Sequence, residues 1–244
     1  MTKFSYKNIY GSKKYNEFIE RQRYVINDKF FYQTGKCELS DGFSVEYTIY
    51  DDKEQKEKGF SFTKAVGAKI ILRNKKRKVY EYYRFNSYAY GFNDIIHHKN
   101  GHRYYPFHVY MYGISFLDVD TLEVYHYIPE GYKHNDDRIC GVSFYIYDVH
   151  YDRKSNLIAY YGSHVGMVYD VMVGDFSEPL NFNPHLVSLY DIFNNEYDEF
   201  DFKEWKDNKL YVMCHDEEKS LSVEKTLSID ELKTLINELI TKGK

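Results

Sequence analysis

The sequence contains few of the residues that mark specialised sites. Its 244 residues include only 3 cysteines, 4 prolines and 1 tryptophan. Cys37, Cys140 and Cys214 form no C-x-x-C pair, so we expect neither a zinc ribbon nor a thioredoxin-like redox site. Few, widely spaced cysteines are typical of a reducing compartment, and we expect a cytoplasmic protein in which each cysteine is a small core residue.

Long apolar runs and established catalytic motifs are also missing. No stretch of 18 apolar residues occurs, so we expect no membrane-spanning helix and no membrane partner. The first 25 residues lack the apolar region of a secretory signal. A glycine-rich phosphate loop, G-x-S-x-G, H-E-x-x-H and an EF-hand loop are absent. We therefore expect no cofactor, and a binding protein rather than an enzyme.

Aromatic residues are the most abundant feature, at 19% of the chain, with 28 Tyr and 17 Phe. Aromatic side chains fit a pleated, half-buried sheet surface, which favours a β-rich fold. Frequent Lys and Asn with little Ala also suggest an AT-rich genome, so codon bias is a second explanation of the tyrosine excess. The fold therefore has to be argued from the residue pattern.

The charge is unevenly distributed along the chain. The net charge is −4, but residues 1–110 carry +9 and residues 111–244 carry −13. Such asymmetry can mark a charged partner. The acidic maximum is 196–207, and the basic maximum is the RNKKRK stretch, with Arg73, Lys75, Lys76, Arg77 and Lys78. This basic stretch lies between two apolar runs, so it also fits an exposed hairpin turn that protects a sheet edge.

Residue periodicity predicts an antiparallel β fold. From about residue 43 the period is two, with Val45, Tyr47 and Ile49 alternating with polar residues. Turn-like sequences separate the apolar segments and leave no room for crossover helices. The segments predicted to be strands are 69–73, 79–85, 104–112, 114–119, 122–128, 144–151, 157–161, 167–173, 186–190 and 210–214.

Both ends of the chain have helical patterns. Ser12 is a possible cap for a short N-terminal helix with Tyr15, Phe18 and Ile19 on one face. Near the C-terminus, Ser228 and Glu231 form a capping-box signature ahead of an amphipathic helix. We thus expect a single β-rich domain over 1–244, with a partly helical segment 1–42, antiparallel units over 43–227 and a helix over 228–242.

Three hairpin turns look alike and recur along the chain. They contain Asn100, Asn156 and Asn208, at intervals of 56 and 52 residues, and a weaker fourth copy turns at Gly59. The chain resembles bacterial β-propeller (WD40-like) repeat proteins over about residues 43–230. Besides the turns, two segments support the resemblance: ISFLDVDTLEVYHYIPEG looks like the outer half of a blade, and FYIYDVHYDRKSNLIAYYG looks like the inner half of the next one. The resemblance implies four-stranded blades, although Trp205 is not followed by Asp. The expected fold is mainly β, with antiparallel four-stranded units that are propeller-like or sandwich-like.

Asp148, His150 and Asp152 are the sharpest candidate for chemistry. On a strand, these three side chains point to one face. A carboxylate–imidazole–carboxylate row can bind a divalent metal or position a general base. The alternative is a solvated face, with Val149 and Tyr151 in the core.

A second candidate is a histidine-rich tract followed by basic and aromatic residues. Such a tract can bind metal, or pair with phosphates while its rings stack on bases. Its spacing matches no established zinc pattern, and solvated hairpin residues are the alternative. The candidate binding residues are His97, His98, His102, Arg103, Tyr104 and Tyr105, with His108 nearby.

Three functions follow from these patterns. The first is a non-enzymatic interaction protein, of inhibitor, immunity or scaffold type, that binds another protein through an aromatic- and charge-rich surface. The second is a nucleic-acid or nucleotide binding protein that uses 73–78 and 97–105, or an inhibitor of a nucleic-acid-processing complex that uses 196–207. The third is a metal-dependent hydrolase that uses Asp148, His150 and Asp152.

Overall fold

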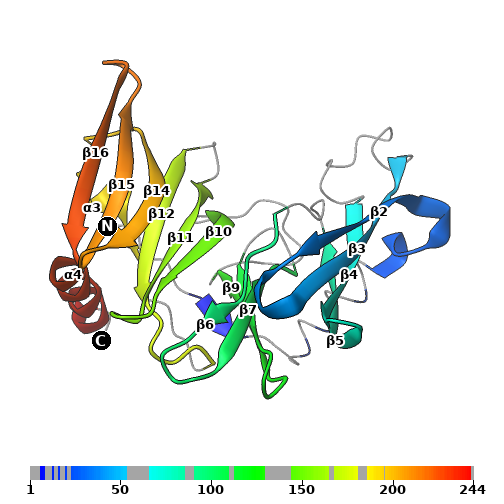
Figure 1. Cartoon of the computed structure of the whole chain (residues 1–244). Coiled ribbons are helices and arrows are strands. Elements are labelled where there is room, and N and C mark those ends of the chain that lie inside the picture. Colours follow the sequence, from blue (N-terminus) through cyan, green and yellow to red (C-terminus); the bar gives the residue numbers. More distant parts are fainter. Residues whose placement is uncertain are drawn as a thin grey trace. The chain divides into compact units, whose positions relative to one another are not determined.

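The structure is a computed structural model that describes residues 6–8, 13, 16, 20, 23–53, 66–85, 91–109, 113–129, 144–164, 168–180, 186–194 and 196–242. It divides the chain into two compact units. Unit 1 comprises Met1–Lys7, His98–Asn100 and Pro129–Lys244, and unit 2 comprises Asn8–His97 and Gly101–Ile128. Figure 1 shows that the described parts are mostly strands.

Unit 2 contains two antiparallel sheets. The first has the order β2-β3-β4-β5, and the second contains β6 to β9 in sequence order. Short 3-10 helices lie before and after β2. The short strand β1 (Tyr6–Asn8) begins in unit 1 and ends at the first residue of unit 2. The elements of unit 2 are η1 (Arg23–Val25), η2 (Asp28–Phe30), β2 (Phe31–Glu38), η3 (Ser40–Gly42), β3 (Phe43–Asp51), β4 (Val66–Asn74), β5 (Arg77–Phe85), β6 (Ile96–His97), β7 (Arg103–Phe107), β8 (Ile114–Asp118) and β9 (Val124–Pro129).

The core of unit 2 follows from the period-two pattern. Along β4, Ala68, Ile70 and Leu72 are fully buried, while the residues between them are partly exposed. Tyr105 and Leu117 from the second sheet belong to the same core cluster. The two sheets of this unit therefore share one apolar core, as alternation in a half-buried strand predicts.

Unit 1 also contains two antiparallel sheets, β10-β11-β12-β13 and β14-β15-β16. Its elements are β10 (Phe144–Asp152), β11 (Leu157–His164), β12 (Tyr169–Asp175), β13 (Val187–Ser188), α3 (Leu189–Ile192), β14 (Glu199–Lys206), β15 (Lys209–Asp216), β16 (Leu221–Ser228) and α4 (Ile229–Lys242). Four successive antiparallel meanders confirm the mainly β fold. The likeness to propeller repeats stays a prediction, because sandwiches are also built from meanders.

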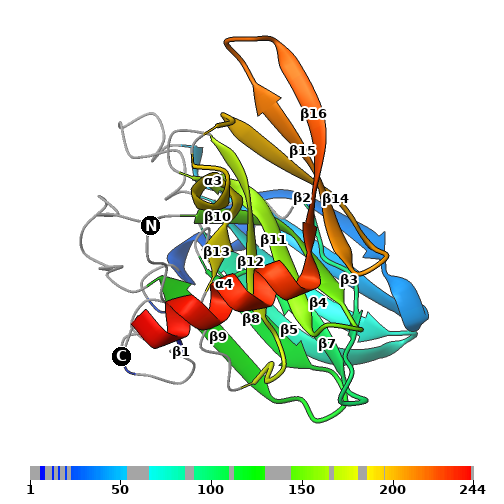
Figure 2. The same cartoon turned by 90° about the vertical axis from the view of Figure 1, so that its left-hand side faces the viewer.

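The predicted C-terminal helix is confirmed as α4. The Ser228 N–H donates to Oε2 of Glu231 at 2.8 Å, and the Glu231 N–H donates to Oγ of Ser228 at 3.2 Å, which completes the capping box. Leu232 and Ile236 are buried in the core of unit 1. Figure 2 shows α4 alongside the strands of this unit. No helix in the described part of the chain is long and apolar enough to cross a membrane.

Two of the three asparagine turns adopt the conformation that suits their residue type. Asn156 and Asn208 have φ of 61° and 58°, a left-handed conformation that asparagine tolerates, whereas Gly101 takes this role beside Asn100, with φ of 94°. Gly59 lies outside the described residues. The strand expected over 186–190 is only partly correct, because β13 ends at Ser188 and α3 follows.

The expected N-terminal helix and the three cysteines are only partly covered by the described residues. Of the expected N-terminal helix, the structure describes only Lys13, Asn16 and Glu20, which are helical and exposed. The expected apolar face of that helix lies outside the described residues, as does Cys140. Cys214 is buried, as expected of a core cysteine, whereas Cys37 is partly exposed.

Candidate functional sites

The basic stretch forms the hairpin turn between β4 and β5, as predicted. Lys75 has φ of 53°, and its N–H donates to the carbonyl of Gly42 at 2.9 Å. The turn therefore lies against η3, the short helical turn between β2 and β3. This contact connects the basic turn to Asp41, the residue before Gly42.

Asp41 connects the basic turn to part of the histidine tract. Its Oδ2 lies 2.8 Å from Nε2 of His97 and 3.8 Å from Nη1 of Arg103. Arg103 also pairs with Asp120, with 2.6 Å between Nη2 and Oδ1. Unit 2 thus brings Lys75, His97 and Arg103 to one end, although they are up to 28 residues apart in sequence.

His102 belongs to the same end of unit 2 and binds a buried carboxylate. Its Nδ1 lies 2.6 Å from Oδ2 of Asp118, whose side chain is 1% exposed. The other oxygen of Asp118 accepts the N–H groups of Asp120 and Thr121, at 2.8 and 3.0 Å. The hydrogen bond to Asp118 and the charge of that carboxylate raise the pKa of His102.

Half of the lysine and arginine side chains at this end are already paired with carboxylates, Arg103 among them. Nε of Arg73 lies 2.6 Å from Oε2 of Glu46, and Nζ of Lys78 lies 3.1 Å from Oε2 of Glu81. Lys75, Lys76 and Arg77 make no ion pair with a described carboxylate. Because neighbouring carboxylates offset the paired cations, this surface attracts a polyanion less strongly than its sequence suggests.

Other residues of the histidine tract lie elsewhere. His98 belongs to unit 1, where its Nε2 lies 2.8 Å from the carbonyl oxygen of Phe176 and its ring packs on Tyr151. Tyr104 and Tyr105 are buried in β7, and the Tyr105 hydroxyl lies 3.1 Å from that of Tyr82. These three residues therefore offer no exposed ring for stacking on a base.

The row Asp148, His150 and Asp152 is only partly assembled. Nε2 of His150 lies 3.2 Å from Oδ2 of Asp148, and its ring stacks on Phe202 with the centroids 3.7 Å apart. Burial acts to raise the pKa of Asp148, but the hydrogen bond and charge of His150 outweigh it, so that pKa is lowered. Asp152 instead caps its own turn, accepting the N–H and the hydroxyl of Ser155 at 3.1 and 2.6 Å.

A metal site does not emerge from this row. Within the residues that the structure describes, no group of three or more His, Cys, Asp or Glu side chains is placed to hold a metal ion. The chemistry that the geometry supports at β10 is therefore a histidine–carboxylate pair beside an aromatic ring.

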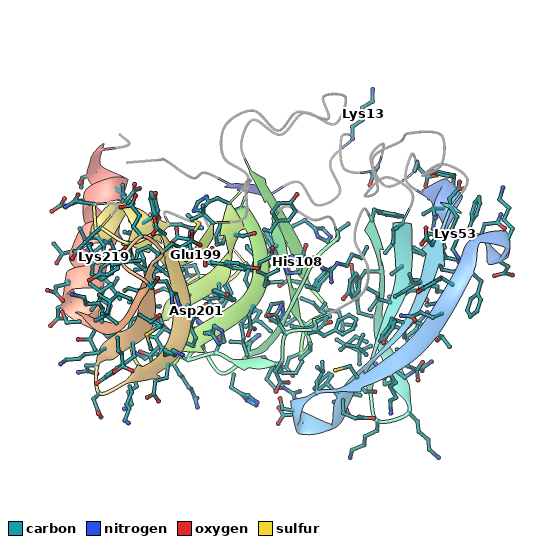
Figure 3. The ribbon with its side chains drawn as sticks, turned by 90° about the horizontal axis from the view of Figure 1, so that it is seen from above. Lys13, Lys53, His108, Glu199, Asp201 and Lys219 are labelled. Atoms are coloured by element: carbon teal, nitrogen blue, oxygen red, sulfur yellow. The ribbon has the colours of Figure 1, made fainter. Side chains whose placement is uncertain are left out.

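An exposed aromatic corner in unit 2 was missed by the sequence analysis. Phe31 and Tyr32 at the start of β2 are 56% and 45% exposed, and Tyr24 in η1 is 48% exposed. They gather around the end of β3, since Phe31 pairs with Tyr50 and Nζ of Lys53 lies 5.7 Å from the centre of the Tyr32 ring. Figure 3 labels Lys53 at this corner. We call Tyr24, Phe31 and Tyr32 the aromatic corner.

Among the described strands, the strand that leaves this corner lies at the edge of its sheet. β2 pairs with β3 and is the first strand in the order β2-β3-β4-β5. None of its residues is buried. The sequence analysis placed residues 1–42 in a partly helical segment, so it did not predict β2, and the position of this strand at an edge follows only from the strand order.

The sequence analysis also missed a chain of polar side chains in unit 1. It connects Tyr161, Asp201, His215 and Ser222, which come from β11, β14, β15 and β16. Their separation in sequence gives no motif, so only the strand pairing reveals them. No protein-family model matches the chain, and no curated protein matches it.

Proposed function

We propose that this protein is an interaction protein that binds an extended segment of another protein along the edge of β2. The observation that supports it is the continuity between an unpaired strand edge and the aromatic corner. Backbone groups of an edge strand provide affinity for an added strand, and exposed aromatic side chains provide anchoring area.

The register identifies the backbone groups of β2 that point away from β3. The Leu39 N–H donates to the carbonyl of Phe43 at 2.9 Å, and in an antiparallel ladder such inward-facing residues alternate with outward-facing ones. The N–H and C=O groups of Thr34, Lys36 and Glu38 therefore point away from β3. An added strand can bond to all three residues.

Two features of β2 favour a partner of particular chemistry. The exposed rings of the aromatic corner can pack against apolar side chains at one end of the bound segment. Lys36 and Glu38 form an ion pair at the other end, with both side chains more than half exposed. We therefore expect a segment with apolar residues near Phe31 and charged residues of both signs near Lys36 and Glu38.

In the register that pairs Lys36 with Glu38, a second copy of the same chain covers this edge incompletely. Antiparallel pairing of two β2 strands about Cys37 would place Lys36 opposite Glu38 twice. In that register, Phe31 falls opposite position 43 of the copy, which already belongs to β3. The aromatic corner would remain uncovered, so a longer strand from another protein covers more of the exposed surface.

Nucleic-acid binding is the second candidate function. It is supported by Lys75, Lys76 and Arg77, which have no described carboxylate partner, and by the gathering of His97 and Arg103 at the same end of unit 2. The paired carboxylates and the burial of Tyr104 and Tyr105 favour the protein partner instead.

A display library of extended peptides, selected on the full chain, tests the first proposal. Selected peptides should lose at least tenfold in affinity for the Phe31→Ser, Tyr32→Ser double variant, measured by fluorescence anisotropy. Leu122→Ser is the matched control, because Leu122 in the same unit is 48% exposed but lies outside the corner. Peptides that bind both variants equally, or a selection that yields no binder, would contradict the proposal.

Light scattering of the purified chain tests whether a second copy of the chain, rather than another protein, binds along β2. A monomer that binds the peptides is the expected result. A dimer that is dissolved by Lys36→Pro, which blocks strand pairing at β2, would identify a second copy as the occupant of this edge, and the hetero-partner would then be wrong.

A further inference from the structure

Four polar side chains form a continuous hydrogen-bonded chain in unit 1. The Tyr161 hydroxyl donates to Oδ1 of Asp201 at 3.0 Å. Nε2 of His215 lies 3.0 Å from Oδ2 of the same carboxylate, and Nδ1 of His215 lies 2.9 Å from Oγ of Ser222. Figure 3 labels Asp201 together with its neighbour on β14, Glu199.

The direction of each hydrogen bond follows from the acceptor at its centre. An ionised carboxylate only accepts, so the neutral His215 ring carries its proton on Nε2 and donates it to Asp201. Nδ1 then holds a lone pair, and the Ser222 hydroxyl donates to it. The serine is therefore positioned to lose its proton to His215.

We propose that Ser222 is a nucleophile for acyl transfer from activated esters, with His215 as its general base. Asp201 is a positioning residue, which holds the ring in the required tautomer and stabilises the imidazolium that forms. This is the logic of a nucleophile, a base and an orienting group in contact, which is recognised by geometry rather than by sequence order.

Two other arrays in the described residues lack this geometry. In unit 1, Ser188 and His164 both bind Oδ2 of Asp170, at 2.5 and 3.0 Å, so the serine donates to the carboxylate and not to the histidine. In unit 2, Ser115 contacts His126, but both residues are buried away from any ester. Among these arrays, Ser222 alone is both exposed and bonded to the base.

The exposure of the site sets the class of substrate. Ser222 is exposed, and the His215 and Asp201 side chains are 31% and 41% exposed. A small ester can therefore reach Oγ without any movement of the chain. Because an open sheet face contributes little binding energy, the reactivity must come from a good leaving group, as in an aryl acetate.

The reaction balances with water as the second reactant. Oγ of Ser222 forms a bond to the carbonyl carbon while its proton moves to Nδ1 of His215. The bond from that carbon to the aryl oxygen breaks, and the phenolate leaves and takes up the proton. Water then attacks the acyl-serine, His215 accepts its proton and returns it to Oγ, and acetate is released.

Incubation of the full chain with p-nitrophenyl acetate tests the proposal. Peptide mapping by mass spectrometry should find the acetyl group on Ser222 and should find it there at least tenfold faster than on Ser220. Ser220 is the matched serine, because it is exposed, two residues away and has no described histidine contact. Equal labelling of the two serines would overturn the proposal.

Substitutions test whether His215 acts as a general base or only supports the structure. His215→Gln should lower the rate of Ser222 acetylation at least tenfold, since general-base catalysis typically contributes about 100-fold or more. Asp201→Asn should also lower it, and Asp201→Glu should restore part of the rate. Ser220→Ala should leave it unchanged, and urea unfolding of each variant checks that unit 1 remains folded.

The result is independent of the proposed partner binding. The acetylation site lies in unit 1, whereas β2 and the aromatic corner lie in unit 2. An unchanged acetylation rate in the folded His215→Gln variant would refute the nucleophile and leave the binding proposal intact.

Discussion

The ring of Tyr47 covers Gly35, the residue directly across from it in the β2–β3 pair. A Cβ at position 35 would overlap that ring. Tyr47 itself packs on Phe92, with the ring centroids 5.5 Å apart. A side-chain contact therefore holds the middle of β2 against β3 and Phe92, while no described strand pairs with its outer edge.

Two glycine substitutions should differ in their effect for this reason. Gly35→Ala meets the end of a side chain that can rotate, so we expect a loss of about 1–3 kcal/mol in the free energy of unfolding. Gly162→Ala meets the backbone carbonyl of Tyr145, which cannot move without disturbing the β10–β11 pair. Its loss should exceed that of Gly35→Ala by at least about 1 kcal/mol in urea unfolding. Equal losses would contradict the close backbone approach at Gly162.

The packing of α4 gives a second prediction. Leu232 is fully buried in the core of unit 1, so Leu232→Ala should lower the free energy of unfolding by about 2–5 kcal/mol. Lys233→Ala, on the exposed side of the same helix, should change it by less than about 0.5 kcal/mol. Similar values for both variants in urea unfolding would show that α4 is not packed on this core.

Acid should destabilise unit 2 through a buried histidine. Burial lowers the pKa of His126 to about 3, against about 6.5 in an unfolded chain. Below pH 6.5 the unfolded state therefore binds more protons, and stability falls as the pH falls. Between pH 7.5 and 5 this residue should account for a loss of about 2 kcal/mol.

The His126→Asn variant measures how much His126 contributes to the pH dependence of stability. His126→Asn keeps a polar group near Ser115 but has no titratable ring. Its unfolding free energy, measured in urea at pH 7.5 and pH 5, should depend less on pH than that of the natural protein, by about 2 kcal/mol. The same pH dependence in both proteins would show that His126 is accessible to protons in the folded state.

The salt dependence of DNA binding tests the competing function. Only Lys75, Lys76 and Arg77 at the basic end lack a described carboxylate partner, so any binding to duplex DNA should involve about three phosphates. The slope of log K against log salt should then be no steeper than about −2.7. A steeper slope that disappears when the three residues are changed to Glu, but not with Lys233→Glu, would favour the nucleic-acid function.

The sequence was most informative where local chemistry determines structure. The period-two pattern along β3, the asparagine and glycine turns and the Ser228–Glu231 capping box were predictable, because each depends on residues close together in the chain. The basic hairpin turn was predictable for the same reason.

The sites were less predictable, because they depend on strand order and on pairing across the sheets. Asp148 and Asp152 share a strand with His150, yet Asp152 binds its own turn instead. Asp201 and Ser222 meet His215 only because β14 and β16 flank β15. Likewise, β2 has only one neighbour among the described strands, which leaves Phe31 exposed at the edge of the sheet, and no periodicity reveals this.

The central claim, that a partner strand adds to β2, is tested most directly by comparing two substitutions at Lys36. Lys36→Ala removes the charge and keeps the outward N–H, whereas Lys36→Pro removes that N–H as well and blocks strand addition. For peptides selected on the natural protein, fluorescence anisotropy should show at least tenfold weaker binding to Lys36→Pro than to Lys36→Ala. Equal affinities for the two folded variants would contradict strand addition at this edge.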